Sequence, residues 1–298
     1  MTNFQAGILA PIPQHALYLH FQCAPMSTND QVKQALNQLT EFSAQHDIVV
    51  GFGSNLLDRL NVAIPNLRNF PAFNNEHITI VRPEFDLWCW LCVNERGELL
   101  QAVQRLQSIL NPVFTLNLQI DAFKYQTGRD LTGYEDGTEN PEAEAAIAAA
   151  IYESDDPRLH GSSFVVVQQW QHNFLQFNAM SEQTQNHIIG RRRIDNEELE
   201  DAPESAHVKR TAQENFEPEA FVVRRSMPWM RDGQGGLYFV AFGHSFDAFE
   251  AQFRKMLGLE DGISDALFQF STPLNNAYFW CPPKQQGRLN LSVFGIQH

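Results

Sequence analysis

Cysteine is scarce in this chain of 298 residues, which contains only Cys23, Cys89, Cys92 and Cys281. Four scattered cysteines are too few for the disulfide framework that stabilises small secreted domains. Long apolar runs are also missing, since none reaches the roughly 18 residues that a membrane-spanning helix needs. The N-terminal segment has neither a basic region nor a long apolar stretch. We therefore expect no secretory signal and a cytoplasmic location.

Basic side chains are few relative to acidic ones. Lys and Arg total 21 against 35 Asp and Glu, which leaves a formal net charge of −14. A surface with this charge repels phosphate backbones and anionic lipid headgroups, so we expect neither nucleic acid nor membrane as a partner. Hydrophobic residues make up 43% of the chain and include 23 Phe, which is enough for a substantial core.

Strand and helix patterns occur in two similar series. Alternating apolar residues predict strands and apolar residues three or four apart predict helices. The first series has strands at 16–24, 48–53, 77–93 (one or two) and 113–123, with helices at 31–46 and 98–110. The second has helices at 142–152, 181–190 and 246–258, with strands at 162–174, 219–229, 235–243 and 267–280. The order β-α-β-β-α-β in each series predicts an α+β fold of two ferredoxin-like units, 1–140 and 141–298, with antiparallel sheets and helices on the outer faces.

The segment G-Y-E-D-G-T-E-N-P at 133–141 joins the two series. Its glycines and its Asn-Pro ending describe a tight turn. One interpretation is a domain linker whose aspartate caps the next helix. The other is a glycine turn that lets the backbone approach a flat ligand while Asp136 points at the ligand's centre.

Two further positions are candidates for chemistry. His207 follows the acidic tract 195–206, and by itself it is either a surface or hydrogen-bonded histidine or a metal ligand. Arg224 and Ser226 are two apart on a predicted strand, so their side chains share one face. An arginine inside an apolar strand pair needs a buried polar or anionic partner. Alternatively, Arg224 points to solvent or pairs with the acidic tract.

Together these elements resemble the dye-decolourising peroxidases, haem enzymes of the dimeric α+β barrel superfamily, in their compact bacterial type without an export signal. The resemblance spans nearly the whole chain. It is carried by the G-x-x-D-G turn at 133–137, I-G-R at 189–191, His207, V-R-x-S at 223–226 and G-L-Y-F at 236–239. It implies one haem b per chain and a peroxidase that uses hydrogen peroxide to oxidise dyes, phenols or similar one-electron donors. The alternatives are a haem-handling protein with incidental peroxidase activity, and a cofactor-free barrel that only assembles.

The resemblance also implies roles for single residues. His207 would be the proximal iron ligand through Nε2, and Asp265 is the candidate carboxylate for its other ring nitrogen. Asp136 would move a proton between the two peroxide oxygens, and Arg224 would stabilise the developing negative charge. Ser226 would hold a distal water, and Arg191 would bind a haem propionate.

Three broader expectations complete the prediction. Aspartates ordinarily titrate near pH ~4, so activity should be best at roughly pH 4–5. The apolar strands suggest a homo-oligomer, a dimer or larger. Cys89 and Cys92 match a C-x-x-C motif, but within a strand they face opposite sides and are expected to pack in the core rather than to act in redox or zinc chemistry.

Overall fold

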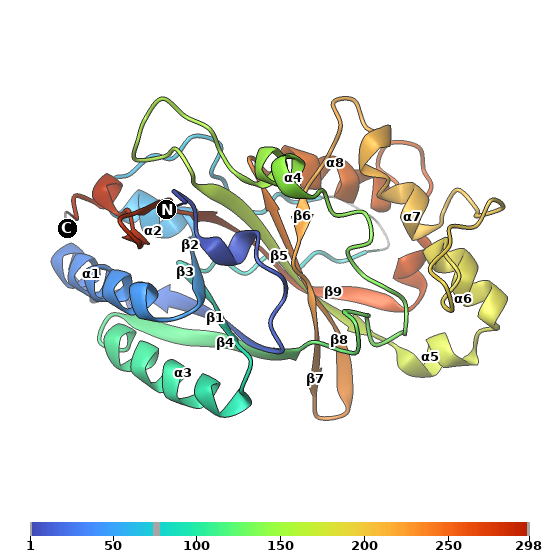
Figure 1. Cartoon of the computed structure of the whole chain (residues 1–298), viewed down its shortest axis with the longest axis horizontal. Helices are drawn as coiled ribbons and strands as arrows, with labels where there is room; N and C mark the ends of the chain where they lie inside the picture. Colours follow the sequence, from blue (N-terminus) through green and yellow to red (C-terminus); the bar gives the residue numbers. More distant parts are fainter. Residues whose placement is uncertain (1, 74–77, 297–298) are drawn as a thin grey trace.

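In the computed structural model, which describes residues 2–73 and 78–296, nine strands form one antiparallel sheet that closes into a barrel (Figure 1). Their order is β5-β9-β2-β3-β1-β4-β7-β8-β6, and β8 also pairs with β5, which closes the ring. The short strand β6 continues the register of β7 along β8. The strands are β1 (His15–Cys23), β2 (Ile48–Phe52), β3 (Leu87–Val93), β4 (Phe114–Phe123), β5 (Ser163–His172), β6 (Val223–Arg224), β7 (Met227–Arg231), β8 (Gln234–Gly243) and β9 (Ser271–Cys281).

Each half of the barrel is a ferredoxin-like sheet. The first has the order β4-β1-β3-β2 and the second β9-β5-β8-β7. Helices lie outside the barrel, as Figure 1 shows. The predicted α+β fold of two such units is therefore confirmed. The helices are α1 (Asn29–Gln45), α2 (Ser54–Arg59), α3 (Arg96–Leu110), α4 (Ala143–Ala150), α5 (Phe174–Ala179), α6 (Glu182–Ile189), α7 (His207–Arg210) and α8 (Asp247–Met256).

Local sequence explains the long helices. Thr28 accepts a hydrogen bond from the backbone N–H of Gln31, whose side chain bonds back to Thr28, so a capping box starts α1. In α8, Phe249, Phe253 and Met256 are buried at helical spacing. These three side chains also line the main cavity described below. The same apolar stripe therefore attaches α8 to the barrel and forms part of the site.

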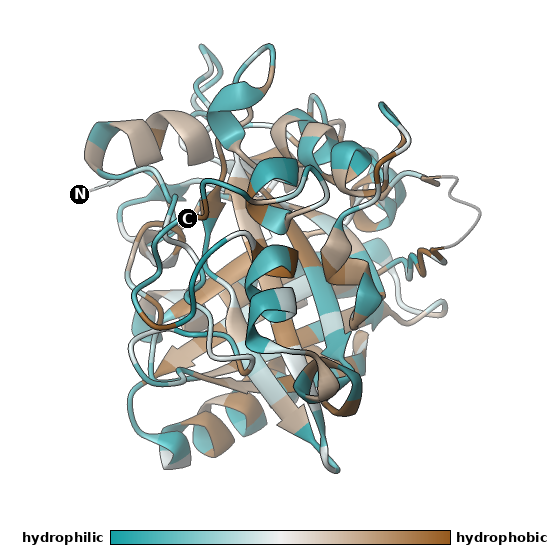
Figure 2. Cartoon of the chain, turned by 90° about the vertical axis from the view of Figure 1, so that its right-hand side faces the viewer, coloured by the Kyte–Doolittle hydropathy of each residue, from teal (hydrophilic) through white to brown (hydrophobic). Residues whose placement is uncertain are grey.

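The core has two main layers separated by the barrel wall. One fills the barrel interior and is rich in aromatic side chains, including Tyr18, Trp88, Trp90 and Phe279. The other lies between the outer faces of the sheets and helices such as α1, α3 and α8. Figure 2, coloured by hydropathy, shows mostly hydrophobic strands in the centre and helices of mixed hydropathy around them. Because side chains alternate along each strand, neighbouring residues on the wall belong to different layers.

Three predicted strands differ from the structure. Residues 78–83 form no strand, and residue 77 lies outside the described residues. The ring closes through the pairing of β8 with β5 without this segment. The predicted strand 219–229 is split into β6 and β7 by a gap at Arg225 and Ser226, where Ser226 Oγ accepts the backbone N–H of Val240. The predicted strand 267–280 begins instead with a 3-10 turn at Ala266–Gln269.

The C-x-x-C segment lies in β3, as expected. Cys89 is buried in the outer core layer, Cys92 is partly buried, and all four cysteines are free. Burial raises the pKa of both the Cys89 and the Cys92 thiol, which keeps them protonated and unreactive. Within the described ranges, no helix has the length and apolar character required to cross a bilayer.

Candidate functional site

A cavity lies against the outer face of the second half of the barrel. Its floor comes from strands β5 and β8 through Trp170, Leu237 and Phe239. Helices α6, α7 and α8 and the turn at 130–136 supply the walls. A mostly apolar cavity with a few converging polar groups is typical of a cofactor or small-molecule site.

His207 is the first residue of α7, on one side of this cavity. Its Nδ1 lies 2.7 Å from Oδ2 of Asp265, whose side chain is fully buried. The other carboxylate oxygen of Asp265 accepts the backbone N–H of Leu267, so the carboxylate is fixed. Because a carboxylate only accepts, His207 donates through Nδ1–H and its Nε2 keeps a lone pair for a ligand. The structure thus brings together the two residues that the sequence paired.

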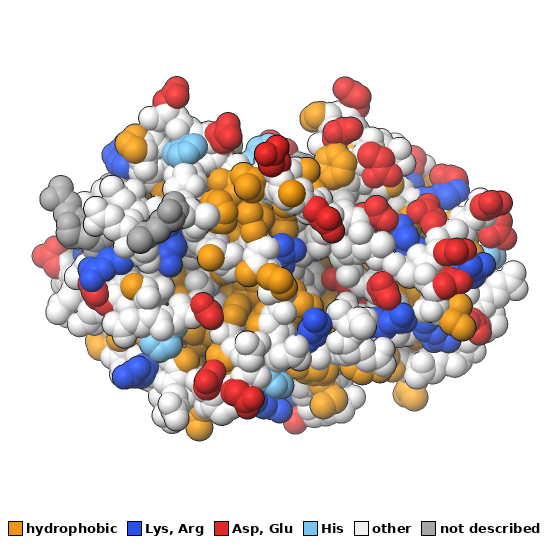
Figure 3. Space-filling model, viewed as in Figure 1, with side chains coloured by type: hydrophobic (Ala, Val, Ile, Leu, Met, Phe, Trp, Pro, Cys, Tyr) orange, Lys and Arg blue, Asp and Glu red, His pale blue; other side chains and the backbone are white. Residues whose placement is uncertain are grey.

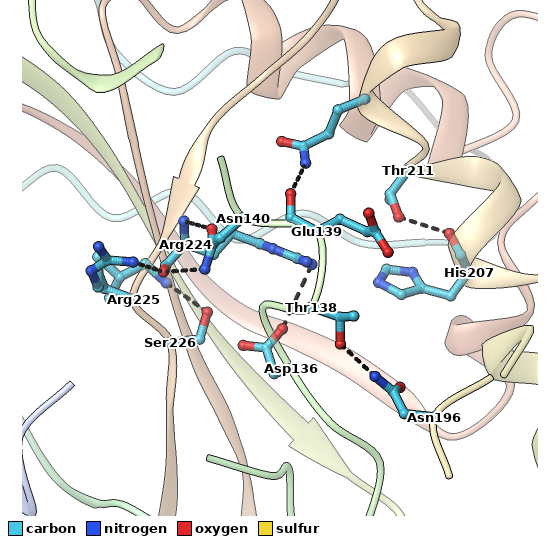
Figure 4. Close-up of polar contacts among 12 residues, drawn as sticks. Asp136, Thr138, Glu139, Asn140, Asn196, His207, Thr211, Arg224, Arg225 and Ser226 are labelled. Carbon is cyan, nitrogen blue, oxygen red and sulfur yellow. Dashed lines mark hydrogen bonds and ion pairs between the residues drawn. The ribbon is translucent and has the colours of Figure 1, made fainter. Parts of the chain in front are cut away.

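Asp136 and Arg224 face His207 from the other side of the cavity (Figure 4). Asp136 Oδ1 lies 3.6 Å from Nη1 of Arg224, and both side chains are largely buried. Gly137, the next residue in the turn, has φ +78°, which glycine adopts at little cost. The turn and strand β6 therefore present a carboxylate and a guanidinium to the same space.

Asn140 attaches this turn to strand β6. Its Oδ1 accepts the backbone N–H of Arg224 at 2.7 Å, and its Nδ2 donates to the carbonyl of Arg224 at 3.0 Å. The pair of bonds imitates a rung of β-ladder and fixes Arg224 relative to Asp136. The Asn-Pro ending of the motif was interpreted only as a turn signal, so this positioning role was missed.

The neighbours of Arg224 take different positions. Arg225 donates through Nη2 to the carbonyl of Leu9, away from Asp136. Ser226 lines an adjoining cavity together with Asp136 and Arg224. The Nε of Arg224 is buried and has no hydrogen-bond partner within the described part of the chain. A buried donor without a partner is costly, and a bound polar molecule would supply one.

Arg191 lies at a second cavity that adjoins the first and shares His207 and Arg224 with it. Its Nη2 contacts Glu139 at 2.5 Å and Glu198 at 3.3 Å. Figure 3 shows many acidic side chains among the basic ones on this side of the molecule. The predicted propionate partner therefore stands beside the cavity, with its guanidinium already paired to two glutamates.

A hydrogen-bonded chain in the cavity wall was not predicted. His172 contacts Ser271 Oγ through Nδ1 at 2.7 Å and Asp130 Oδ2 through Nε2 at 3.1 Å. Burial opposes ionisation of Asp130, but His172 and the hydrogen bonds from Thr132 outweigh it and lower the pKa of that carboxyl. Only the pairing of β5 with β9 places His172 opposite Ser271. No spacing in the sequence carries that information.

Protein side chains alone do not form a metal centre here. In residues 2–73 and 78–296, no group of three or more His, Cys, Asp or Glu is arranged to hold a metal ion.

The family model described as "Dyp-type peroxidase, C-terminal" matches residues 127–286, more than half of the chain and the whole of the site above. The chain belongs to the Dyp-type peroxidase family. The predicted family and the predicted peroxidase activity are thus confirmed. Among curated Dyp-type peroxidases, one from Mycobacterium tuberculosis is 29% identical over 244 residues, which cover 79% of this chain and 72% of the relative.

Solved structures of the family superpose over almost the full chain. A dye-decolorizing protein from Vibrio cholerae is 26% identical, with a TM-score of 0.85 and coverage of 98% of this chain and 99% of that one. A Dyp-type peroxidase protein from Shewanella oneidensis is 25% identical, with a TM-score of 0.88 and complete coverage of both chains. A variant of a Rhodococcus jostii Dyp-type protein, solved in complex with heme, is 25% identical with a TM-score of 0.84 and covers 93% of this chain and 95% of that one.

Proposed function

We propose that this Dyp-type peroxidase holds one haem b in the main cavity, with His207 as the proximal ligand, and uses hydrogen peroxide to oxidise dyes, phenols or similar one-electron donors. The proposal rests on one observation, that two different kinds of side chain face each other across one cavity. A histidine with an available Nε2 faces a carboxylate and a guanidinium in apolar surroundings.

Haem is the cofactor, and the residues present fit it. The apolar walls suit a flat macrocycle, and Nε2 of His207 suits its iron. Asp265 holds the imidazole and makes it a stronger donor. Arg191 can bind a propionate if Glu139 or Glu198 moves aside, because a propionate offers the same carboxylate group. When bound, the haem would supply redox-active iron for the reaction with peroxide.

The chain's own residues then control protons and charge. Asp136 would take a proton from one oxygen of the peroxide and return it to the other oxygen, which leaves as water. Arg224 stabilises the negative charge that develops on the oxygens, and its unpaired Nε adds a donor. Ser226 holds a water beside Asp136. With a carboxylate as the proton carrier, we expect activity to be highest at roughly pH 4–5.

Single replacements test the proximal side. We expect His207→Ala to abolish the Soret absorbance band of the purified protein. Asp265→Asn should lower haem affinity by about 10- to 100-fold while the chain remains folded. A Soret band unchanged in His207→Ala would contradict the assignment of the iron ligand.

The distal side is tested by activity at saturating haem. Asp136→Ala and Arg224→Ala should keep the Soret band but lower peroxide turnover by ~10²-fold or more. Arg225→Ala is the matched control, because this neighbouring arginine points away from Asp136, and its turnover should stay near that of the wild type. Full turnover in both distal variants would favour a haem-handling protein with incidental activity. An optimum above pH ~7 would count against Asp136 as the only proton carrier.

The proposal includes three further predictions. A cytoplasmic location, a homo-oligomeric assembly and a division into units at 1–140 and 141–298 stay predictions. Light scattering of the purified protein tests the second, and limited proteolysis around residue 140 tests the third.

A further inference from the structure

A buried glutamine, Gln213, lies in the chain between the proximal residue His207 and the distal residue Arg224. It begins the 3-10 turn Gln213–Asn215, which follows α7, and only 4% of its surface is exposed. A buried amide needs partners at both ends, because its oxygen only accepts hydrogen bonds and its NH₂ group only donates them. The identity of these partners shows which segments the side chain holds together.

Each end of the Gln213 amide bonds to the main chain of a different segment on the distal side. Nε2 donates to the carbonyl of Glu139 at 2.7 Å, in the turn that carries Asp136. Oε1 accepts the backbone N–H of Val222 at 2.9 Å, two residues before Arg224. The side chain therefore joins the segment after α7 to both of the segments that supply the distal pair.

The next residue of the turn completes this attachment. Asn140 bonds through its side-chain amide to the backbone N–H and the carbonyl of Arg224 (Figure 4). Because Glu139 and Asn140 are consecutive, the turn is bonded to Gln213 at one residue and to the strand at the next. Along the chain that enters β6, Val222 is bonded by Gln213 and Arg224 by Asn140. The turn, the strand and the segment after α7 thus form one hydrogen-bonded unit.

The backbone around Gln213 is held in place from two directions. The carbonyl of Gln213 accepts the N–H of Ala220 at 2.9 Å, which closes the loop between them. Gln252 of α8, which lines the main cavity, donates through Nε2 to the carbonyl of Ala220 at 2.7 Å. On the other side, Thr211 Oγ1 donates to the carbonyl of His207 at 2.8 Å, where the chain leaves α7. Gln213 is therefore fixed relative to both His207 and α8.

These bonds decide how the distal pair lies relative to the proximal histidine. Asp136 Oδ1 and Arg224 Nη1 are 3.6 Å apart. The two groups can act on one peroxide molecule only while the turn and the strand keep their places opposite His207. His207 is held separately, by its hydrogen bond to Asp265. Loss of the Gln213 amide should therefore shift the distal pair and leave the proximal ligand in place.

We propose that Gln213 is a positioning residue of the peroxidase reaction, whose amide holds Asp136 and Arg224 in place relative to the proximal ligand His207. The inference rests on the proposed haem peroxidase function, because Gln213 is assigned an effect only through those three residues. The residues that line the two cavities in the described chain do not include Gln213. It therefore acts through its hydrogen bonds and not by contact with a ligand.

Fluoride binding to the haem-loaded ferric enzyme tests this role. Fluoride is a small anion that accepts a hydrogen bond from a distal donor such as Arg224, so its affinity reports where that donor lies. Gln213→Ala should bind haem as the wild type does but bind fluoride about 10-fold more weakly, the effect of one lost hydrogen bond.

Gln5→Ala is the matched control. Gln5 is 2% exposed and bonds through both ends of its amide to the backbone N–H and the carbonyl of Val50, in the first half of the barrel. This variant should lose stability in urea, as Gln213→Ala does, because both remove a buried amide that bridges main-chain groups. Its affinity for fluoride should stay that of the wild type.

Gln213→Glu tests the bond to Glu139 by itself. An ionised glutamate still accepts the N–H of Val222 but cannot donate to the carbonyl of Glu139, whereas the protonated acid can do both. Burial favours the protonated form. The fluoride affinity of this variant should therefore equal that of the wild type at pH ~5 and be about 10-fold lower than that of the wild type at pH ~8. In Gln213→Ala the affinity should stay below that of the wild type at both pH values.

Two results would overturn the positioning role. One is a fluoride affinity that is unchanged in Gln213→Ala or is lowered equally in Gln5→Ala. The other is a Gln213→Glu variant whose affinity relative to the wild type does not recover in acid, and this comparison decides alone if Gln213→Ala does not fold. The Soret band, recorded before fluoride is added, separates this inference from the proposed function. A wild-type protein that binds no haem refutes the proposed function itself.

Discussion

Acid should destabilise this barrel through one buried side chain, His20. The imidazole lies in the barrel interior between the rings of Phe85 and Phe279, at centroid distances of 4.5 and 5.9 Å. Burial lowers its pKa to about 3. In the unfolded chain a histidine titrates near pH ~6.5. Between these two values the unfolded chain binds a proton that the folded protein does not bind.

The sign and size of the effect follow from this difference. Because the folded pKa is the lower one, the contribution of His20 to stability is fully present above pH ~6.5 and is lost as pH falls toward 3. At pH ~4.5 the solution is two pH units below the pKa of this histidine in the unfolded chain. Its protonation there lowers the free energy of unfolding by about 3 kcal/mol relative to pH ~8. The proposed acidic optimum for activity thus lies where this histidine destabilises the fold.

Urea unfolding of the wild type and of His20→Gln, each at pH ~8 and pH ~4.5, measures the effect. The free energy of unfolding should fall between the two pH values by about 3 kcal/mol more in the wild type than in the variant, because all other titrating groups are shared. His160→Gln, in an exposed turn, controls for the removal of a histidine as such. Equal pH dependence in the wild type and in His20→Gln would refute the reasoning.

Three other replacements probe the scaffold of the site. Asn140→Ala removes both hydrogen bonds to the backbone of Arg224 and should cost about 1–3 kcal/mol in urea unfolding and lower peroxide turnover, whereas unchanged turnover would show that Arg224 needs no such support. Asp261→Asn removes the carboxylate that Arg210 binds. Since that hydrogen bond lowers the pKa of Asp261 to about 2, the stability difference from the wild type should be full above pH ~4 and vanish as pH falls through about 2. Gly236→Ala places a Cβ 2.1 Å from a carbonyl oxygen of β5 and should destabilise by about 2 kcal/mol or more, so a thermal midpoint equal to that of the wild type would contradict the close approach of the two strands.

Local patterns predicted most helices and strands, because an element with one buried face has apolar residues at the spacing of that helix or strand. The helices at 31–46 and 246–258 and the strand at 162–174 agree with α1, α8 and β5 to within a few residues. Elements that depend on distant partners were less predictable. Residues 78–83 have the composition of a strand, but the barrel is closed without them.

The residues in and near the site also differ in how far the sequence alone could predict them. His207, Asp136 and Arg224 were predicted because their order and spacing resemble those in one family. That resemblance made the prediction possible without knowledge of the fold. The structure brings these three residues together around one cavity. By contrast, the contact of His20 with Tyr238 depends on how β1 faces β8 across the barrel, which is set by packing between strands more than 200 residues apart in sequence. No local signal in the sequence encodes such a contact.

The closure of the barrel has a consequence for the unity of the molecule. The two sheets meet at seams where the paired residues are Phe52 with Trp280, between β2 and β9, and Ala122 with Trp229, between β4 and β7. Within each sheet, neighbouring strands share far longer ladders. His20 belongs to one sheet and Tyr238 to the other, so their hydrogen bond exists only while both seams are shut. If the strands at a seam came apart, the Tyr238 hydroxyl and His20 Nε2 would separate. This hydrogen bond therefore reports whether the two halves of the barrel remain joined.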